Sequence, residues 1–578
     1  MNRETFLSSF AYIADAPGGI DTLRDTIRQL AVEGRLVPQS AKDEPASHIL
    51  QACLQRKRAL VQGGTVRRRA ELPAITSDEL SFTVPPGWAL ARLDSWCDIA
   101  GGVAKGRKLS GHETVTLPYL RVANVKAGYL LLDEVKTIGL PFDEVPRYSL
   151  RAGDVLLTEG GDWDKLGRSA IWGGEIDPCL HQNHIFRARP LTDGVLPEWI
   201  SLFTNSKEGR RYFQSKAKRT TNLASINMTE LRSTPLPVPP TEEQHRICGR
   251  VNELMRLCDE FVTQQAAHVD ARTALTAATL HRVSRAEPAR EVRGALAAFA
   301  DNIDIHLASG DGDLAAIKHL RQAILDMAVR GRLSRQDASD EPVAELQNRI
   351  ATERSRRVRA KEMRKPATLP PIESADCAFD VPDHWVWCRL GEVCQTRLGK
   401  MLDAQKNTGT LRRYLRNSSV QWNRFELGDL KEIRVEDCEL GEYSLSDGDL
   451  VVVEGGEPGR CAVWDSDLAD GIMVFQKALH RVRPEGGVSA RFLALLLRNG
   501  VNDGRLQGLF TGTTIKHLTG EKLKLYAIPL PPVQEQHRIV DRVSELMAVC
   551  NELEQQLVTA RTARGELANS VVAHAILI

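Results

Sequence analysis

Cationic side chains gather in the segment 207–219, where six lysines and arginines accompany a single acid, Glu208. Hydroxyl and amide side chains follow at once along the chain. Lysine and arginine neutralise phosphates, whereas serine, threonine and asparagine reach phosphate oxygens or base edges. The segment therefore predicts contact with a polyanion such as nucleic acid; the alternative is a solvated helix end and loop. The candidates here are Lys216, Lys218, Arg219, Thr221, Asn222, Ser225 and Asn227.

Smaller groups of donors follow strand-like runs. Arg121 and Asn124 come after one such run, and arginine favours guanine while asparagine favours adenine in the major groove. Lys165 and Arg168 follow Glu159-Gly160-Gly161, where glycine permits close approach of a ligand, although a plain turn explains the pattern equally well. Later in the chain the corresponding candidates are Arg416, Asn417, Arg460, Lys477, Thr513, Thr514 and Lys516.

Two further basic stretches, 56–69 and 354–365, favour a solvated face or an acidic partner over DNA contact. The net charge is only +1, from 76 basic and 75 acidic side chains, so bulk charge gives no support for nucleic-acid binding. DNA affinity depends on where cations meet phosphates. The prediction therefore depends on local groups of side chains.

The signals for catalysis are poor. Gly101 to Lys108 lacks the Gly-Lys-Ser/Thr of a phosphate-binding loop. His181 and His184 have no third ligand at metal spacing, and the eleven cysteines contain no Cys-x-x-Cys pair. No Pro-Pro pair has the Asn/Asp-Pro-Pro-Tyr/Phe setting of an amino-methyltransferase. We expect no metal and no catalytic residue in this chain.

The elements that must position these donors are present twice. Residues 23–36 recur as residues 320–333, and the Val-Pro-x-x-Trp pattern that begins at Val84 recurs at Val381. Later matches include Glu159-Gly160-Gly161 with Glu454-Gly455-Gly456, and Glu243-Gln244 with Glu535-Gln536. Ordered matches over nearly the whole chain identify a tandem duplication.

Each copy has the same order of expected elements. A helix (20–36 and 314–333) precedes a second, basic helix (45–61 and 342–365), then a region of short strand-like runs and glycine turns, and finally a Pro-Pro break before a long helix. Thr241 to Gln244 predicts a capping box at the first long helix. At 578 residues the chain is long enough for several cores.

The two long helices carry apolar residues at alternating spacings of four and three, which predicts a coiled-coil seam. Helices of this length suit rigid spacers that pair antiparallel and hold the two strand-rich modules apart. The predicted spacer and subunit-binding residues are Ile247, Val251, Leu254, Phe261, Ile539, Val543, Leu546 and Leu553.

With these motifs in order, the sequence resembles the specificity subunits of type I restriction–modification systems, in particular longer members with an N-terminal helical extension. The resemblance rests on the Pro-Pro-x-x-Glu-Gln boundaries, the Ala-Val-x-Gly-Arg-Leu helix ends and the Gly-Asp-Val/Leu…Glu-Gly-Gly turns. It implies an α+β fold, a tandem pseudo-two-fold repeat of two target recognition domains separated by long antiparallel coiled-coil helices. The expected domains are an N-terminal helical region (1–78), recognition domain 1 (79–240), a central helical spacer (241–375), recognition domain 2 (376–532) and a C-terminal helix (533–578).

The resemblance implies a non-catalytic subunit that binds a bipartite, asymmetric site in double-stranded DNA. Its partners would be two methyltransferase subunits and the restriction subunits, which would carry S-adenosylmethionine, ATP and Mg²⁺. The N-terminus lacks a long apolar signal region, and no stretch has the roughly 20 apolar residues of a membrane span, so we expect a cytoplasmic protein. The alternatives are an enzyme in its own right, a protein-binding scaffold, and a recognition subunit of another defence system.

Overall fold

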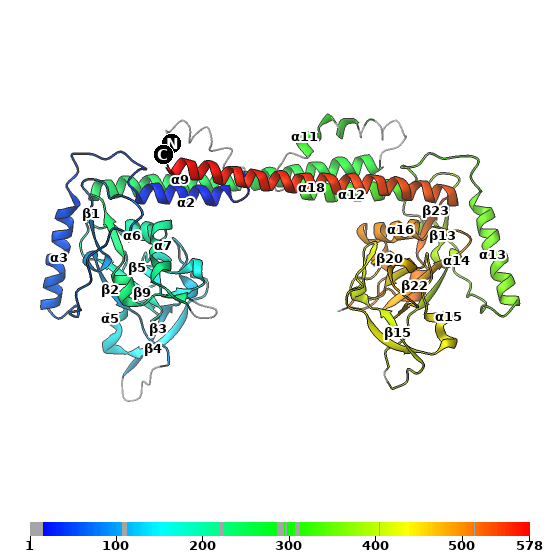
Figure 1. Cartoon of the computed structure of the whole chain (residues 1–578), viewed down its shortest axis with the longest axis horizontal. Coiled ribbons are helices and arrows are strands. Elements are labelled where there is room, and N and C mark those ends of the chain that lie inside the picture. Colours follow the sequence, from blue (N-terminus) through cyan, green and yellow to red (C-terminus); the bar gives the residue numbers. More distant parts are fainter. Residues whose placement is uncertain are drawn as a thin grey trace. The chain divides into compact units, whose positions relative to one another are not determined.

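The computed structural model describes residues 16–106, 113–219, 224–285, 294, 297–299, 301–306, 313–403, 405–513 and 515–577. The chain divides into two compact units (Figure 1), each with its own main hydrophobic core. The first unit comprises Met1–Ala267 with Arg561–Ile578, and the second comprises His268–Ala560. The last part of the chain therefore belongs with the first part.

The first unit contains the two helices α2 and α3, a strand-rich module that includes shorter helices, and the start of a long helix that continues into the second unit. The helices are α2 (Gly19–Val32), α3 (Ala46–Gln62), α4 (Leu93–Trp96), α5 (Val145–Tyr148), α6 (Pro197–Thr204), α7 (Lys207–Lys216), α8 (Met228–Arg232) and α9 (Thr241–Arg285). The strands are β1 (Ala89–Arg92), β2 (Cys97–Gly101), β3 (Thr114–Leu120), β4 (Lys136–Pro141), β5 (Val155–Thr158), β6 (Gly160–Gly161), β7 (Ser169–Ile171), β8 (Leu180–His181), β9 (Ile185–Pro190), β10 (Lys218–Arg219), β11 (Ala224–Ser225) and β12 (Pro235–Val238).

The second unit repeats most of this order of elements and ends in a long helix that continues into the first unit. Its helices are α11 (Ile303–His306), α12 (Asp313–Val329), α13 (Val343–Arg359), α14 (Leu390–Val393), α15 (Leu440–Tyr443), α16 (Ala490–Asn502), α17 (Gly520–Lys524) and α18 (Val533–Leu577). Its strands are β13 (Val386–Arg389), β14 (Cys394–Leu398), β15 (Thr410–Leu415), β16 (Val420–Gln421), β17 (Arg424–Phe425), β18 (Lys431–Val435), β19 (Leu450–Val453), β20 (Cys461–Val463), β21 (Val474–Phe475), β22 (Leu479–Pro484) and β23 (Ala527–Leu530).

Sheet topology confirms the duplication. The four-stranded sheet β2-β9-β5-β7 corresponds to β14-β22-β19-β20, and the three-stranded sheet β4-β3-β8 corresponds to β18-β15-β21. In each module the first and last strands, β1 with β12 and β13 with β23, form a separate antiparallel pair. This pair brings the entry and exit of the module together next to the start of the long helix.

The repeated glycine at the end of the first helix of each copy has a structural reason. Gly34 and Gly331 adopt φ values of 70° and 68°, which end the helix in the left-handed region. A Cβ on Gly34 would lie 2.6 Å from Pro85, and one on Gly331 would lie 2.7 Å from Pro382. Two motifs distant in the sequence therefore pack against each other. Because the helix ends before this glycine, α2 stops at Val32, short of the predicted Leu36.

The apolar stripes of the long helices pack within their own units. Ile247 and Val251 belong to the core that α2 shares with the first module, and Leu254 and Phe261 border it. Ile539 and Val543 belong to the core that α12 shares with the second module, with Leu546 and Leu553 at its border. Coiled-coil pairing of the two long helices with each other stays a prediction.

Two local predictions were wrong. The basic helix of the second copy ends at Arg359, before the predicted Lys365. The capping box at Thr241 does not form, because the Thr241 hydroxyl donates to the Gly194 carbonyl (3.1 Å) and the Gln244 amide donates to the Pro240 carbonyl (2.9 Å). The side chain of Gln244 instead bonds to the end of the module: it accepts from the Leu196 amide and donates to the Gly194 carbonyl, both at 2.9 Å.

Candidate nucleic-acid interface

The glycine turn of the first module lies directly against the basic segment. Strand β6, formed by Gly160 and Gly161, pairs with β11, and β11 pairs with β10, which carries Lys218 and Arg219. A Cβ on Gly160 would lie 2.9 Å from the Ala224 carbonyl oxygen, so the absence of a side chain permits this approach. The structure thus joins two donor groups that are distant in the sequence.

The loop after the glycine turn is fixed by side chains of the neighbouring segment. The Arg219 guanidinium carbon lies 3.7 Å from the centre of the Trp163 ring, and the Gln214 side chain donates to the Trp163 carbonyl (3.3 Å). Lys165 forms an ion pair with Asp162, and their hydrogen bond lowers the pKa of the Asp162 carboxyl. These contacts hold the loop in a defined shape.

Arg168 connects this loop to the turn after β3. Its guanidinium donates to the Val122 carbonyl (3.3 Å), one residue beyond Arg121, which donates to the Glu134 carbonyl (3.3 Å). Three segments of the first module therefore converge. We define the donors that these segments carry, half-buried or exposed, as the first donor face: Arg121, Lys165, Arg168, Lys218, Arg219 and Ser225.

Other predicted residues of the first module are engaged in the fold. Asn124 is buried, and its amide donates to the carbonyls of Leu131 (2.7 Å) and Glu134 (3.0 Å). The Asn227 side chain caps α8 by accepting from the Thr229 amide (2.8 Å). We leave both out of the interface because their polar atoms are used locally.

The basic segment 207–219 divides into two parts. Arg210 forms an ion pair with Asp25 of α2 (3.0 Å), and Arg211 donates to the carbonyl of Glu79 (2.9 Å) and pairs with Glu208. These arginines hold α7 to the helical region. Lys216 is exposed at the end of α7, 5.9 Å from the Tyr212 ring centre, and only the residues after it reach the donor face.

Equivalent loops converge in the second module. Gly455 bridges to His517, which also bridges to Thr511, so the segment 511–517 lies on the glycine turn as β11 does in the first module. The Asn417 amide donates to the Gly455 carbonyl (2.5 Å), and Arg460 donates to the Asn417 side-chain oxygen (3.1 Å). The sequence did not reveal this bond between two predicted residues.

Further donors surround this turn. Arg416 pairs with Asp429 (2.5 Å), and Lys477 is exposed beside Ala478, whose carbonyl accepts from the Glu454 amide (2.9 Å). Thr513 and Lys516 are exposed within the segment 511–517. The second donor face comprises Arg416, Arg460, Lys477, Thr513 and Lys516; Asn417 is left out, as Asn124 is, because both polar atoms of its side chain bond within the turn. The predicted residues Thr221, Asn222 and Thr514 lie outside the described residues.

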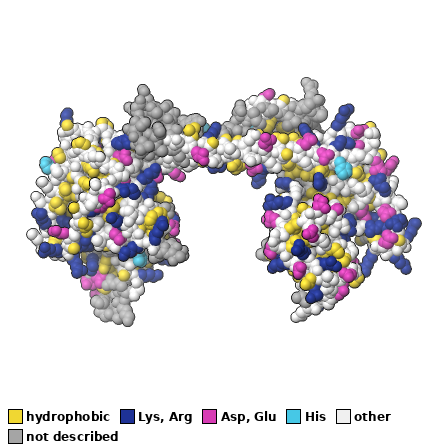
Figure 2. Space-filling model, in the orientation of Figure 1, with side chains coloured by type: hydrophobic (Ala, Val, Ile, Leu, Met, Phe, Trp, Pro, Cys, Tyr) yellow, Lys and Arg dark blue, Asp and Glu magenta, His cyan; other side chains and the backbone are white. Residues whose placement is uncertain are grey.

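The two donor faces are built on equivalent loops but expose different side chains. The first presents Trp163 with Arg219 stacked on it, whereas the second presents Ile515, which is 59% exposed, next to Lys516. Sequence analysis singled out Arg219 but not its contact with Trp163, because the two lie 56 positions apart and no short-range pattern links them. Lysines and arginines otherwise lie among acids over the visible face of each unit (Figure 2).

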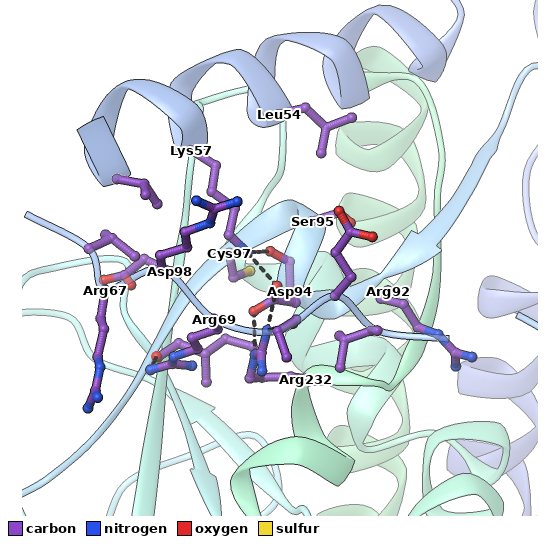
Figure 3. A pocket seen from close by; sticks show the side chains of 17 residues that line it. Leu54, Lys57, Arg67, Arg69, Arg92, Asp94, Ser95, Cys97, Asp98 and Arg232 are labelled. Atoms are coloured by element: carbon purple, nitrogen blue, oxygen red, sulfur yellow. Dashed lines mark hydrogen bonds and ion pairs between the residues drawn. The ribbon is translucent and has the colours of Figure 1, made fainter. Parts of the chain in front are cut away.

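A pocket of about 370 Å³ in the first unit is lined by none of the donor-face residues and lies between α3 and the start of the module (Figure 3). Its basic residues are largely paired. Lys57 and Arg232 both bind Asp94, the latter at 2.7 Å, and Arg69 donates to the Ile99 carbonyl (2.9 Å). At the equivalent place in the second unit, Arg354 donates to the carbonyl of Gly391 (3.1 Å) and pairs with Glu485 (2.5 Å). These cations attach the basic helices to their modules.

Within the described residues, no group of three or more His, Cys, Asp or Glu side chains could hold a metal ion. His181 is instead buried, with its ring 3.3 Å from the Tyr148 carbonyl. No helix in the described part of the chain is long and apolar enough to cross a membrane.

Two modules with one frame and different loop donors define a tandem recognition protein. The family model described as the type I restriction modification DNA specificity domain matches residues 85–270 and 382–560. The chain belongs to this family. It is accordingly a DNA-recognition subunit of a type I restriction system rather than a catalytic one, as its resemblance predicted.

Two relatives from Escherichia coli have names that agree with this assignment. The chain is 27% identical over 574 residues to the specificity subunit of the Escherichia coli type I restriction enzyme EcoAI, covering 96% of this chain and 94% of that one. It is 26% identical over 568 residues to the EcoEI specificity subunit, also from Escherichia coli, covering 96% and 93%. The crystal structure of the HsdS subunit from Thermoanaerobacter tengcongensis is 17% identical, with a TM-score of 0.39, covering 86% of this chain and 98% of that one.

Proposed function

We propose that this chain recognises a split, asymmetric DNA sequence, with one module contacting each part. The observation that carries the proposal is the pair of donor faces, built on equivalent loops yet presenting different side chains. An identical frame places hydrogen-bond donors at corresponding positions, while different side chains select different bases. A site read by two such modules would be bipartite and asymmetric.

We further propose that the chain directs methyltransferase and restriction subunits to this site in the cytoplasm. In support, the long helices expose large apolar side chains that a partner could cover: Leu257 (41%) and Val262 (41%) on α9, and Val549 (52%) and Val558 (48%) on α18. The partners would bind S-adenosylmethionine, ATP and Mg²⁺. This chain would contribute the choice of sequence and the spacing between its two parts.

A map of modified bases tests the proposal. Genomic DNA is compared by long-read sequencing between cells with this gene and cells without it, in a strain that expresses the partner subunits. Loss of modification at one split, asymmetric motif is the expected result. An unchanged map would overturn the proposal and favour a protein-binding scaffold.

A further inference from the structure

The Arg219 guanidinium lies over the Trp163 ring in the first donor face. Its carbon lies 3.7 Å from the ring centre, a distance of direct stacking. Trp163 is 37% exposed, and Arg219 is exposed as well. The structure gives Arg219 no ion pair or side-chain hydrogen bond with a described residue, in contrast to Arg168, Arg210 and Arg211 of the same module.

A guanidinium that stacks on an indole has its plane restricted by the ring while its edge stays free. The N–H donors of arginine lie in that plane and form a rigid fork. An indole beneath the plane therefore restricts rotation without using a donor. The fork keeps its capacity to donate two parallel hydrogen bonds to a ligand that approaches edge-on.

Three further contacts hold this pair in place. Arg219 belongs to β10, which pairs with β11, and β11 pairs with the glycine turn that precedes Trp163. The Gln214 side chain donates to the Trp163 carbonyl (3.3 Å). Side chains supported in this way lose less freedom on binding, which favours a specific contact over general attraction to phosphate.

We propose that Arg219, oriented by Trp163, reads a guanine in the part of the DNA site that the first module contacts. Its fork would donate to the O6 and N7 atoms at the major-groove edge of that base. The inference rests on the proposed function and names one base-reading residue within it. In the second module Thr511 bridges to His517 as Lys218 pairs with Ser225, so Gly512 takes the place of Arg219. This mode of reading therefore belongs to the first half-site.

Arg219→Lys is the decisive variant because lysine keeps the charge and loses the fork. The variant replaces the natural chain in cells that express the whole system, and modified bases are mapped as above. We expect one guanine position in one half of the motif to lose its preference over other bases by roughly tenfold or more. The other half should stay unchanged and serves as the internal control for folding and assembly.

Atom-level evidence comes from binding of the purified complex to duplexes carrying the mapped site. Replacing that guanine with 7-deazaguanine removes the N7 acceptor, which should weaken the wild-type complex several-fold and leave Arg219→Lys little affected. Trp163→Phe should retain the preference and Trp163→Leu should reduce it. Lys218→Ala should weaken binding to all duplexes alike if it contacts phosphate.

The proposal is overturned if Arg219→Lys keeps full discrimination at every position, or if it lowers modification equally at all sites. Equal sensitivity of both complexes to 7-deazaguanine would overturn it as well. Failure of the proposed function can be distinguished from failure of this inference. In that case the wild-type chain itself would give no bipartite motif in the first map.

Discussion

At the scale of residues, a buried arginine closes each module. Arg389 is 8% exposed, binds Asp376 (2.9 Å) and donates to the carbonyls of Pro370, Pro371 and Leu525. Arg92 has the equivalent role in the first module, with Glu79 as its carboxylate. These arginines join the segment that enters the module to the one that leaves it.

Removal of this arginine should destabilise its unit strongly. Arg389→Ala leaves a carboxylate and three carbonyls without their donor, so we expect the free energy of unfolding of the second unit to fall by about 3–5 kcal/mol. Urea denaturation followed by tryptophan fluorescence measures the change. Arg424→Ala is the matched control, because its pair with Glu426 is 70% and 54% exposed and should contribute less than about 1 kcal/mol. Equal losses in the two variants would contradict this assignment.

One buried residue makes the first module sensitive to acid. Burial, followed by repulsion from Arg187, lowers the pKa of His181 from 6.5 to about 4. The unfolded chain therefore binds more protons than the folded chain between these values, and stability falls as the pH falls from 6.5 to 4. Phe475 occupies the equivalent position in the second module, since β8 corresponds to β21.

His181→Phe should remove this sensitivity. Between pH 6.5 and pH 4, we expect the free energy of unfolding to fall by about 3 kcal/mol less in the variant than in the wild-type chain. Unfolding of the first unit in urea would measure this difference. His48→Gln is the control, because His48 is exposed. A pH dependence in His181→Phe that matches the wild type would show that His181 is not the group responsible.

At the scale of elements, the repeated Glu-Gln motif is a joint between module and long helix. Gln244 accepts from the Leu196 amide (2.9 Å) and donates to the Gly194 carbonyl (2.9 Å), while Gln536 accepts from the Ser489 amide (2.8 Å). Glu535 accepts from the Trp385 indole (3.0 Å), and burial raises the pKa of its equivalent, Glu243. The Glu-Gln motif that both copies carry is therefore structural.

Loss of the glutamine should loosen this joint. Gln536→Ala leaves the buried Ser489 amide and the Pro531 carbonyl without partners, at a cost of about 1–3 kcal/mol. Hydrogen exchange at the start of α16 should quicken. Gln556→Ala lies on the exposed face of the same helix and should change stability by less than about 0.5 kcal/mol. Unchanged amide hydrogen exchange near Ser489 in Gln536→Ala would show that Gln536 does not hold the module to the long helix.

At the scale of the whole molecule, the end of the chain completes the first unit. Arg561–Ile578 groups with Met1–Ala267, and Ala568 is only 2% exposed. The long helix α18 begins on the core of the second unit and ends in the first. The two repeats are therefore not two independent stretches of sequence.

Truncation after Ala560 tests this arrangement. We expect amide hydrogen exchange in α2 to quicken by about tenfold or more, because its unit loses part of its packing, while α12 and α16 keep their protection. Mass spectrometry of peptides resolves the two regions. Faster exchange in α12 of the same size would show that the terminal segment belongs to the second unit instead.

Sequence analysis predicted the frame of the molecule well and the donors only in part. Gly34 and Pro85 belong to motifs that recur in both copies because they pack against each other, so repetition correctly indicated residues that the frame requires. Asn124 and Arg210 have residue types suited to DNA, yet the structure places one in a buried turn and the other against Asp25. Residue type shows what a side chain can bind, whereas neighbours decide whether it is free to do so.

The sequence by itself determined the duplication, the order of elements and the family, because these are properties of pattern and period along the chain. The tertiary structure alone decided which donors share a face, that Arg219 stacks on Trp163, and that the last segment of the chain joins the first unit. The physical reason is that such contacts join residues far apart in the chain. They arise from strand pairing and core packing rather than from any local pattern.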